Sequence, residues 1–176
     1  MKKLNLKKLT VTAILAAVAV VGSLFSFPVF GSKCAPVQHL VNVLCAVTVG
    51  PWWALAQAFI ASLIRNLLGL GSLMAFPGSM IGALCCGLAY MAFRKLWLTC
   101  IAEASGTGIL GGLAAYPVAK LMMGLNPGGL FVYIVPFLVS TVVGSILAYF
   151  LVTALQKGGV ISMYRHPAKK EMKMSQ

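Results

Sequence analysis

Long apolar stretches separated by short turns run from Leu9 to Leu155, and Glu103 is the only acidic residue among them. A charge at the centre of a bilayer costs at least a few kcal/mol, so a sequence this poor in Asp and Glu is typical of membrane-spanning segments. Four stretches exceed the roughly 20 residues that a helix needs to cross about 30 Å of hydrocarbon. They are residues 9–30, 72–93, 96–123 and 130–155.

A fifth apolar stretch, residues 37–64, has an awkward length. As one helix it would measure about 42 Å, which is too long for one upright crossing and short for two. Gly50 and Pro51 stand near its middle, where proline removes a backbone donor and glycine relaxes the chain. The pattern therefore predicts a hairpin of two short helices, 37–49 and 51–64.

The basic residues support the resulting count of six helices. With six crossings, eleven basic residues fall on one side of the membrane and three (Lys33, Arg65 and Lys120) on the other, and the positive-inside rule makes the richer side cytoplasmic. We therefore predict an all-α membrane protein, a compact bundle of six transmembrane helices with both termini and a basic tail, 157–176, in the cytoplasm. The eleven are Lys2, Lys3, Lys7, Lys8, Arg94, Lys95, Lys157, Arg165, Lys169, Lys170 and Lys173.

Composition narrows the class further. The 176 residues are 60% hydrophobic and 9% charged, and no stretch is polar enough for a second, soluble domain, so 1–176 is predicted to be one transmembrane domain. The net charge of +12 sits at the ends of apolar segments, where it sets topology and meets anionic lipid, so no nucleic-acid partner is expected. The first apolar run is too long for a secretory signal. The five cysteines lack a CxxC spacing, and no metal or cofactor is predicted.

Four polar motifs stand out against the apolar background: CAPVQH at 34–39, RNLLGLGSLMAFPGSM at 65–80, EASGTGILGG at 103–112, and Tyr116-Pro117 one turn before Lys120. CAPVQH is expected in the first outer loop. Pro77 is expected to break the fourth helix and to free backbone carbonyls there. Glycines in the fourth and fifth helices let backbones approach closely.

Taken in this order, these motifs resemble the ThiW family, the substrate-binding S components of energy-coupling factor (ECF) transporters for the thiazole precursor of thiamine. The resemblance implies six helices with cytoplasmic termini in a prokaryotic cell membrane. It also implies three partners, a transmembrane coupling protein and two cytoplasmic ATPases. The sequence itself contains no Walker motif, so it supplies no ATPase of this kind. S components commonly dock the coupling protein through AxxxA on the first helix, which Ala13 and Ala17 match, although such spacing also serves internal packing.

Site candidates follow from the same motifs. Gln38 and His39 offer two hydrogen-bonding groups to a small heteroaromatic ligand. Asn66 and Ser79 are candidates that also suit the freed backbone of the fourth helix. Tyr116 and Tyr133 would either stack on a ring or anchor the helices at the interface.

Two charged residues are assigned differently. Arg65 is expected to snorkel at the outer end or to bind loop carbonyls rather than to contact the ligand. Glu103 lies about 10 Å from the cytoplasmic end of its helix by rise per residue. A pairing with Arg94 or Lys95, or a coupling role, competes there with ligand contact, and we expect the structural or coupling role.

Other functions stay open at this point. The chain could serve another vitamin precursor or be a structural membrane subunit. An intramembrane enzyme could use Cys34 and His39 as nucleophile and base, although Glu103, the acid that would orient the histidine, is expected on the opposite side.

Overall fold

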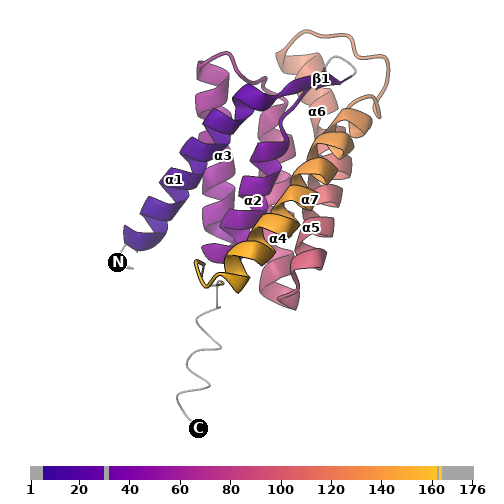
Figure 1. Cartoon of the computed structure of the whole chain (residues 1–176). Coiled ribbons are helices and arrows are strands. Elements are labelled where there is room, and N and C mark those ends of the chain that lie inside the picture. Colours follow the sequence, from indigo (N-terminus) through magenta and orange to yellow (C-terminus); the bar gives the residue numbers. More distant parts are fainter. Residues whose placement is uncertain (1–5, 30–31, 162, 164–176) are drawn as a thin grey trace, which may run out of the picture.

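The computed structural model describes residues 6–29, 32–161 and 163 (Figure 1). Phe30, the last residue of the predicted first helix, lies outside the described residues, and so does most of the predicted basic tail. The basic residues outside them are Lys2, Lys3, Arg165, Lys169, Lys170 and Lys173. The fold is mostly helical, and six helical segments are present among the described residues. The predicted helical class and six helical segments are thus confirmed, while six membrane crossings stay a prediction.

The first helix, α1 (Leu6–Gly22), ends earlier than predicted. It passes into a short turn, η1 (Ser23–Phe25), and then into an antiparallel hairpin of β1 (Phe27–Val29) and β2 (Ser32–Cys34). The expectation of a single helix from Leu9 to Phe30 is therefore wrong for residues 26–29, since the helical stretch ends at Phe25. Pro28 explains the change, because proline has no amide hydrogen and keeps the preceding residue extended.

The predicted hairpin of two short helices is present as α2 (Pro36–Thr48) and α3 (Pro51–Leu67). Gly50 joins them with a φ of 108°, a conformation that favours glycine, and Pro51 opens α3 at a position where a missing amide hydrogen costs nothing. Each helix therefore begins with a proline. At 13 residues α2 is only about 20 Å long, shorter than the hydrocarbon thickness of about 30 Å.

The fourth helix, α4 (Ala75–Phe93), begins only two residues before Pro77. A proline in the first turn removes an amide that would have no helical partner in any case. The expectation that Pro77 breaks this helix and frees carbonyls is therefore wrong. The segment from Ser72 to Met74 is a turn leading into the helix.

The fifth helical segment, Leu96–Met122, is continuous but changes its winding. It consists of α5 (Leu96–Ser105), the π-helical η2 (Gly106–Gly111), α6 (Gly112–Pro117) and the π-helical η3 (Val118–Met122). The last helix, α7 (Ile134–Lys157), returns along the bundle. Wide π turns inside a helix are uncommon and are often found at functional sites.

Glycines bring α4 and the fifth segment into backbone contact, as predicted. A Cβ at Gly111 would lie 2.7 Å from the Cα of Gly78, and one at Gly106 would lie 3.2 Å from the Cα of Gly82. Larger residues would force the two helices apart, because real Cβ atoms do not approach backbone so closely.

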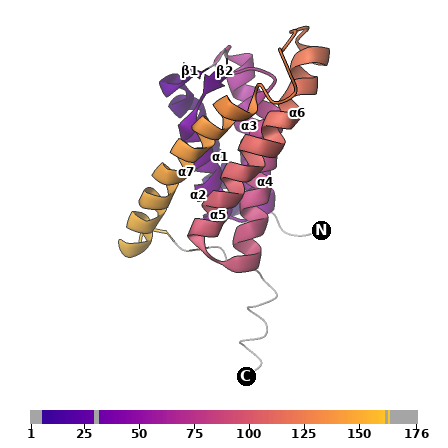
Figure 2. The ribbon, with the colours of Figure 1, turned by 90° about the vertical axis from the view of Figure 1, so that its right-hand side faces the viewer.

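The six segments run alternately up and down, so that the start of α1 and the end of α7 lie at the same end of the bundle (Figure 1). The β1–β2 hairpin and the region of α6 lie at the other end (Figure 2). We call this the outer end. Among the described residues, four segments are long and apolar enough to cross a membrane: α1 with η1, α4, the fifth segment and α7. Crossing by α2 and α3, and cytoplasmic termini, stay predictions.

Candidate functional site

A cavity of about 50 Å³ lies in the outer half of the bundle, beneath the β1–β2 hairpin. A water molecule needs roughly 10–15 Å³ of such space, so the cavity has the size of a few waters or one small ring. Its wall is built from β2, the starts of α2 and α4, the end of α3, η2 and α7. The lining residues are Ser32, Lys33, Ala35, Gln38, His39, Arg65, Gly71, Ser72, Met74, Ala75, Gly78, Ser79, Thr107, Phe137 and Ser140.

Gln38 and His39 line this cavity from the first turn of α2 rather than from a loop. Pro36 is compatible with the first turn of a helix, and this is why CAPVQH turns helical so early. Gln38 is held in place, since its Nε2 donates a hydrogen bond to Ser62 Oγ at 3.1 Å. The expectation of an outer-loop position for these two side chains is wrong, and both lie inside the bundle.

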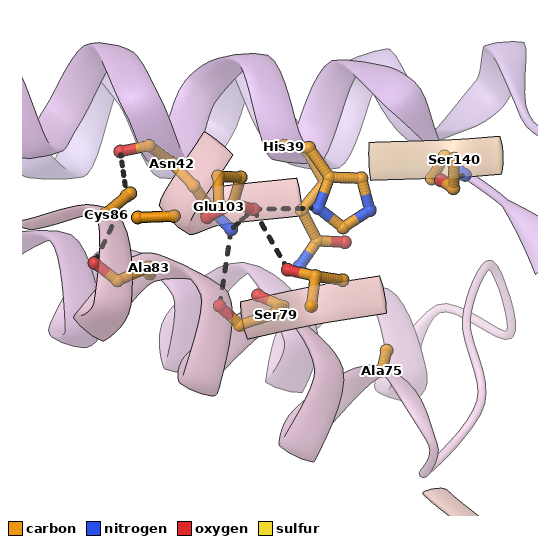
Figure 3. A network of polar contacts seen from close by, with 12 residues as sticks. His39, Asn42, Ala75, Ser79, Ala83, Cys86, Glu103 and Ser140 are labelled. Carbon is orange, nitrogen blue, oxygen red and sulfur yellow. Dashed lines mark hydrogen bonds and ion pairs between the residues drawn. The ribbon is translucent and has the colours of Figure 1, made fainter. Parts of the chain in front are cut away.

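His39 joins a buried polar cluster at the inner side of the cavity (Figure 3). Its Nδ1 lies 3.0 Å from Glu103 Oε1. The same oxygen accepts hydrogen bonds from Asn42 Nδ2 and from Thr107 Oγ1, each at 3.1 Å. Asn42 Nδ2 also lies 3.3 Å from the backbone oxygen of Ser79. We call His39, Asn42, Glu103 and Thr107 the inner cluster, and it ties α2 to α4 and to the fifth segment.

Glu103 is completely buried, and the structure corrects its expected surroundings. Its described contacts are with the inner cluster, in place of the expected Arg94 or Lys95. Glu103 lies about 10 Å from the inner end of the fifth segment by rise per residue. The helix α2 is short, so His39 lies only nine residues, about 13 Å, from the inner end of α2. Both side chains thus meet at mid-depth. The expectation that they lie on opposite sides is wrong.

Gly82 makes room for this meeting. A Cβ at residue 82 would lie 2.8 and 2.9 Å from the two carboxyl oxygens of Glu103 and would collide with Thr107 Oγ1. Such contacts are closer than real Cβ atoms adopt. The missing side chain of α4 is therefore what allows a carboxyl group to fit between α4 and α2.

Arg65 lies near the end of α3, with its side chain turned to the cavity. It is only 3% exposed, so the expectation of a snorkelling anchor is wrong. Its Nε has no hydrogen-bond partner in the described chain. The backbone of Arg65, rather than its side chain, holds the loop that follows α3, since the Arg65 carbonyl accepts hydrogen bonds from the amides of Leu70 and Gly71.

Of the other candidates, Ser79 lines the cavity and the rest do not. The hydroxyl of Ser79 is buried without a partner. Asn66 donates to the carbonyls of Ser62 and Ser72, at 2.8 and 3.1 Å, and so holds the loop between α3 and α4. Tyr133 is buried in a cluster with Met74. Tyr116 lies under the ammonium group of Lys120, 6.0 Å from its ring centre.

Sequence reasoning missed Asn42, Thr107, Lys33 and Phe137. Phe137 lines the cavity from α7 and packs on Gly78, where a Cβ would lie 2.7 Å from its ring. Nothing distinguishes Phe137 from other apolar residues of its helix. Asn42 could have been found, because it follows Gln38 by four residues and so continues the same polar face of α2.

Cys34 is poorly suited to be a nucleophile. Its thiol is buried in β2 and donates a hydrogen bond to the carbonyl of Pro136 at 3.1 Å. Burial raises the pKa of this thiol above its ordinary value, which disfavours the reactive thiolate. The thiol therefore fastens the hairpin to α7.

The comparisons with known proteins agree with the character of this site. No curated protein matches the chain. The ThiW family, described as "Thiamine-precursor transporter protein (ThiW)", matches residues 9–158, which is most of the chain and includes every helix that builds the cavity. An apolar helical bundle enclosing a small polar and aromatic cavity suits a membrane protein that carries a small molecule. The chain belongs to the ThiW family of thiamine-precursor transporters.

Proposed function

We propose that this protein is the substrate-binding S component of an ATP-driven ECF importer in the prokaryotic plasma membrane, and that it takes up a thiazole precursor of thiamine. The family match supports transport of a thiamine precursor. The observation that carries the assignment of the site is the cavity beneath the hairpin. It offers an aromatic face, Phe137, and hydrogen-bonding groups on Gln38, His39 and Ser79, the combination that a small heteroaromatic ring requires.

The inner cluster defines how His39 meets the ligand. Nδ1 faces Glu103, so the other ring nitrogen, Nε2, is the one left for a ligand. Thr107 and Ser79 complete the same side of the cavity. A ring bound over Phe137 would thus form a hydrogen bond with His39, whose orientation the contact with Glu103 fixes. Glu103 does not line the cavity, which supports its structural or coupling role.

Access to the cavity would be controlled from the outer end. Ser32 and Lys33 of β2 belong to its wall, so the β1–β2 hairpin forms part of its cover. In the proposed cycle the hairpin region closes over ligand captured from outside. ATP hydrolysis by the two partner ATPases, acting through the coupling protein, then reorients the bundle.

Ala13 and Ala17 are proposed to dock the coupling protein. Both are exposed on α1, whereas Ala16 and Ala19 of the same helix are buried against the bundle. Internal packing therefore uses the other face of α1. Replacing Ala13 and Ala17 by Leu should weaken association with the coupling protein in a pull-down while leaving ligand affinity intact.

The direct test is titration of the full-length protein in lipid nanodiscs with hydroxyethylthiazole. His39→Ala should raise the Kd about tenfold or more, because one buried hydrogen bond is worth roughly 1–3 kcal/mol. Ser105→Ala is the matched control, since Ser105 is exposed on the fifth segment and is not part of the cavity wall.

Two results would overturn the proposal. One is absence of binding by the folded wild-type protein to any thiazole tested. The other is ATP-driven accumulation by the chain alone in liposomes, because an S component depends on partner ATPases.

A further inference from the structure

The cavity holds a buried cation without an anion. Arg65 is 3% exposed and lines the wall, and its Nε has no hydrogen-bond partner in the described chain. A guanidinium group removed from water is stable only when a counter-charge and hydrogen-bond acceptors replace its hydration. The described residues offer Arg65 no such counter-charge.

The sequence has very few acids that could supply one. It contains two acidic residues, Glu103 and Glu171. The contacts of Glu103 are with His39, Asn42 and Thr107, and Glu103 is not part of the cavity wall. Glu171 lies outside the described residues.

Other residues of the cavity wall also favour a negative group. Lys33 is a second cation on the wall. The hydroxyls of Ser32 and Ser79 are buried without partners and can both donate hydrogen bonds. The helices α2 and α4 both begin at the cavity, and the N-terminal end of a helix carries partial positive charge. The hairpin strand β2 thus presents a cation and a hydroxyl donor to the cavity, α2 and α4 present their N-terminal ends, and the C-terminal end of α3 brings the guanidinium group of Arg65.

We propose that the ligand of this cavity carries an oxyanion group, a carboxylate or a phosphate, that Arg65 binds. The proposal rests on the proposed function and names the substrate class of the same site as an acidic heteroaromatic compound. The guanidinium fork matches the two oxygens of a carboxylate or phosphate. The ring of the ligand lies toward His39 and Phe137, while its acidic group lies toward Arg65, Ser32 and Lys33.

The test compares three thiazoles that differ in charge. The full-length protein in nanodiscs is titrated with neutral hydroxyethylthiazole, with its phosphate ester, and with a thiazole carboxylate. We expect one or both acidic compounds to bind at least tenfold more tightly than the alcohol. Which of the two gains more shows whether the site prefers carboxylate or phosphate.

Variants then assign the difference to Arg65. Arg65→Gln should weaken binding of the acidic compound at least tenfold while changing the affinity of the alcohol less than threefold, and Arg65→Lys should fall between. Lys120→Gln is the control for loss of a cation, because Lys120 is exposed on η3 and not part of the wall. It should leave all three affinities unchanged.

The outcomes separate this inference from the proposed function. If the alcohol binds as tightly as the acids, or if Arg65→Gln weakens all three equally, the oxyanion site is refuted and the thiazole transporter stands. If no thiazole binds, the proposed function fails, and methyl phosphate and acetate become the probes. Binding of either probe that Arg65→Gln abolishes would uphold the oxyanion site, and absence of binding would refute it.

Discussion

Glu103 and Arg65 are both ionisable side chains buried in the same bundle, yet their surroundings differ. Oε1 of Glu103 is in contact with three neighbouring side chains, Oε2 is buried without a hydrogen-bond partner in the described chain, and Glu103 is not among the residues that line the cavity. Arg65 lines the cavity and has no partner for its Nε. A polar group that is paired away from the cavity serves the fold, whereas an unpaired group on the cavity wall is available to a ligand. Glu103 and Asn42 are therefore scaffold, whereas the cavity wall, which includes His39, is recognition surface.

The largest effect is expected where the scaffold has no room to adjust. Gly82→Leu would place a side chain against the carboxyl oxygens of Glu103, and the backbone of Gly106 lies close behind. Overpacking a site between two backbones should cost more than about 3 kcal/mol of unfolding free energy. Denaturant unfolding of the variant and the wild-type protein in detergent micelles measures this loss of unfolding free energy.

Gly129→Leu is the control for this change, because a Cβ at residue 129 meets nothing within 4 Å. Equal stability of the two variants would contradict the assigned packing of the inner cluster.

The next effect distinguishes a structural role of the Glu103 carboxyl group from a role in ligand binding. Glu103→Ala removes the acceptor for Asn42 and Thr107 and should cost about 2–3 kcal/mol of stability, because buried donors are left unpaired. Glu103→Gln keeps an acceptor and should cost less. Since Glu103 does not line the cavity, Glu103→Gln should keep ligand affinity within a few-fold while impairing transport or stability.

Titration and thermal unfolding of Glu103→Gln decide this point together. A loss of binding beyond about a hundredfold, which is about 2.7 kcal/mol, in a normally folded variant would place Glu103 among the ligand contacts. The contrast between scaffold and recognition surface would then be lost.

A smaller effect tests the aromatic wall. Phe137→Leu keeps an apolar side chain but loses the ring face, and it should lower the affinity for a thiazole about three- to tenfold. Tyr133→Leu is the comparison, because Tyr133 packs 6.5 Å from Phe137, centre to centre, without lining the cavity. Titration of both variants should show a larger loss for Phe137→Leu, and the reverse order would move the ring site.

The helices were more predictable than the site because they depend on local properties. Apolar length and the Gly50-Pro51 pair indicate the α2–α3 hairpin from neighbouring residues alone. The meeting of His39 with Glu103 depends on how far α2 reaches into the bundle. That reach depends in turn on where α2 begins and ends, which Pro36 at its start and Gly50 just after its end determine.

The chemistry of single residues was harder still to predict. Arg65 stands at the end of an apolar helix, a position typical of a snorkelling residue. Its burial comes from the loop of residues 68–74, which turns back on the carbonyl of Arg65. Phe137 is one of many apolar residues on α7, and only the glycine opposite it, Gly78, gives its ring a place at the cavity.

The smallest expected effect distinguishes two polar residues that the same sequence motif contains. Ser79 has an unpartnered hydroxyl on the cavity wall, so Ser79→Ala should lower ligand affinity about two- to fivefold, the worth of a modest hydrogen bond, and leave stability unchanged. Asn66 binds the carbonyls of Ser62 and Ser72 and does not line the cavity, so Asn66→Ala should cost about 1 kcal/mol of stability and little affinity. Titration and thermal unfolding of both variants should give opposite patterns. If Ser79→Ala lowers stability while Asn66→Ala lowers affinity, partnered and unpartnered groups do not divide into scaffold and recognition surface as the contrast between Glu103 and Arg65 requires.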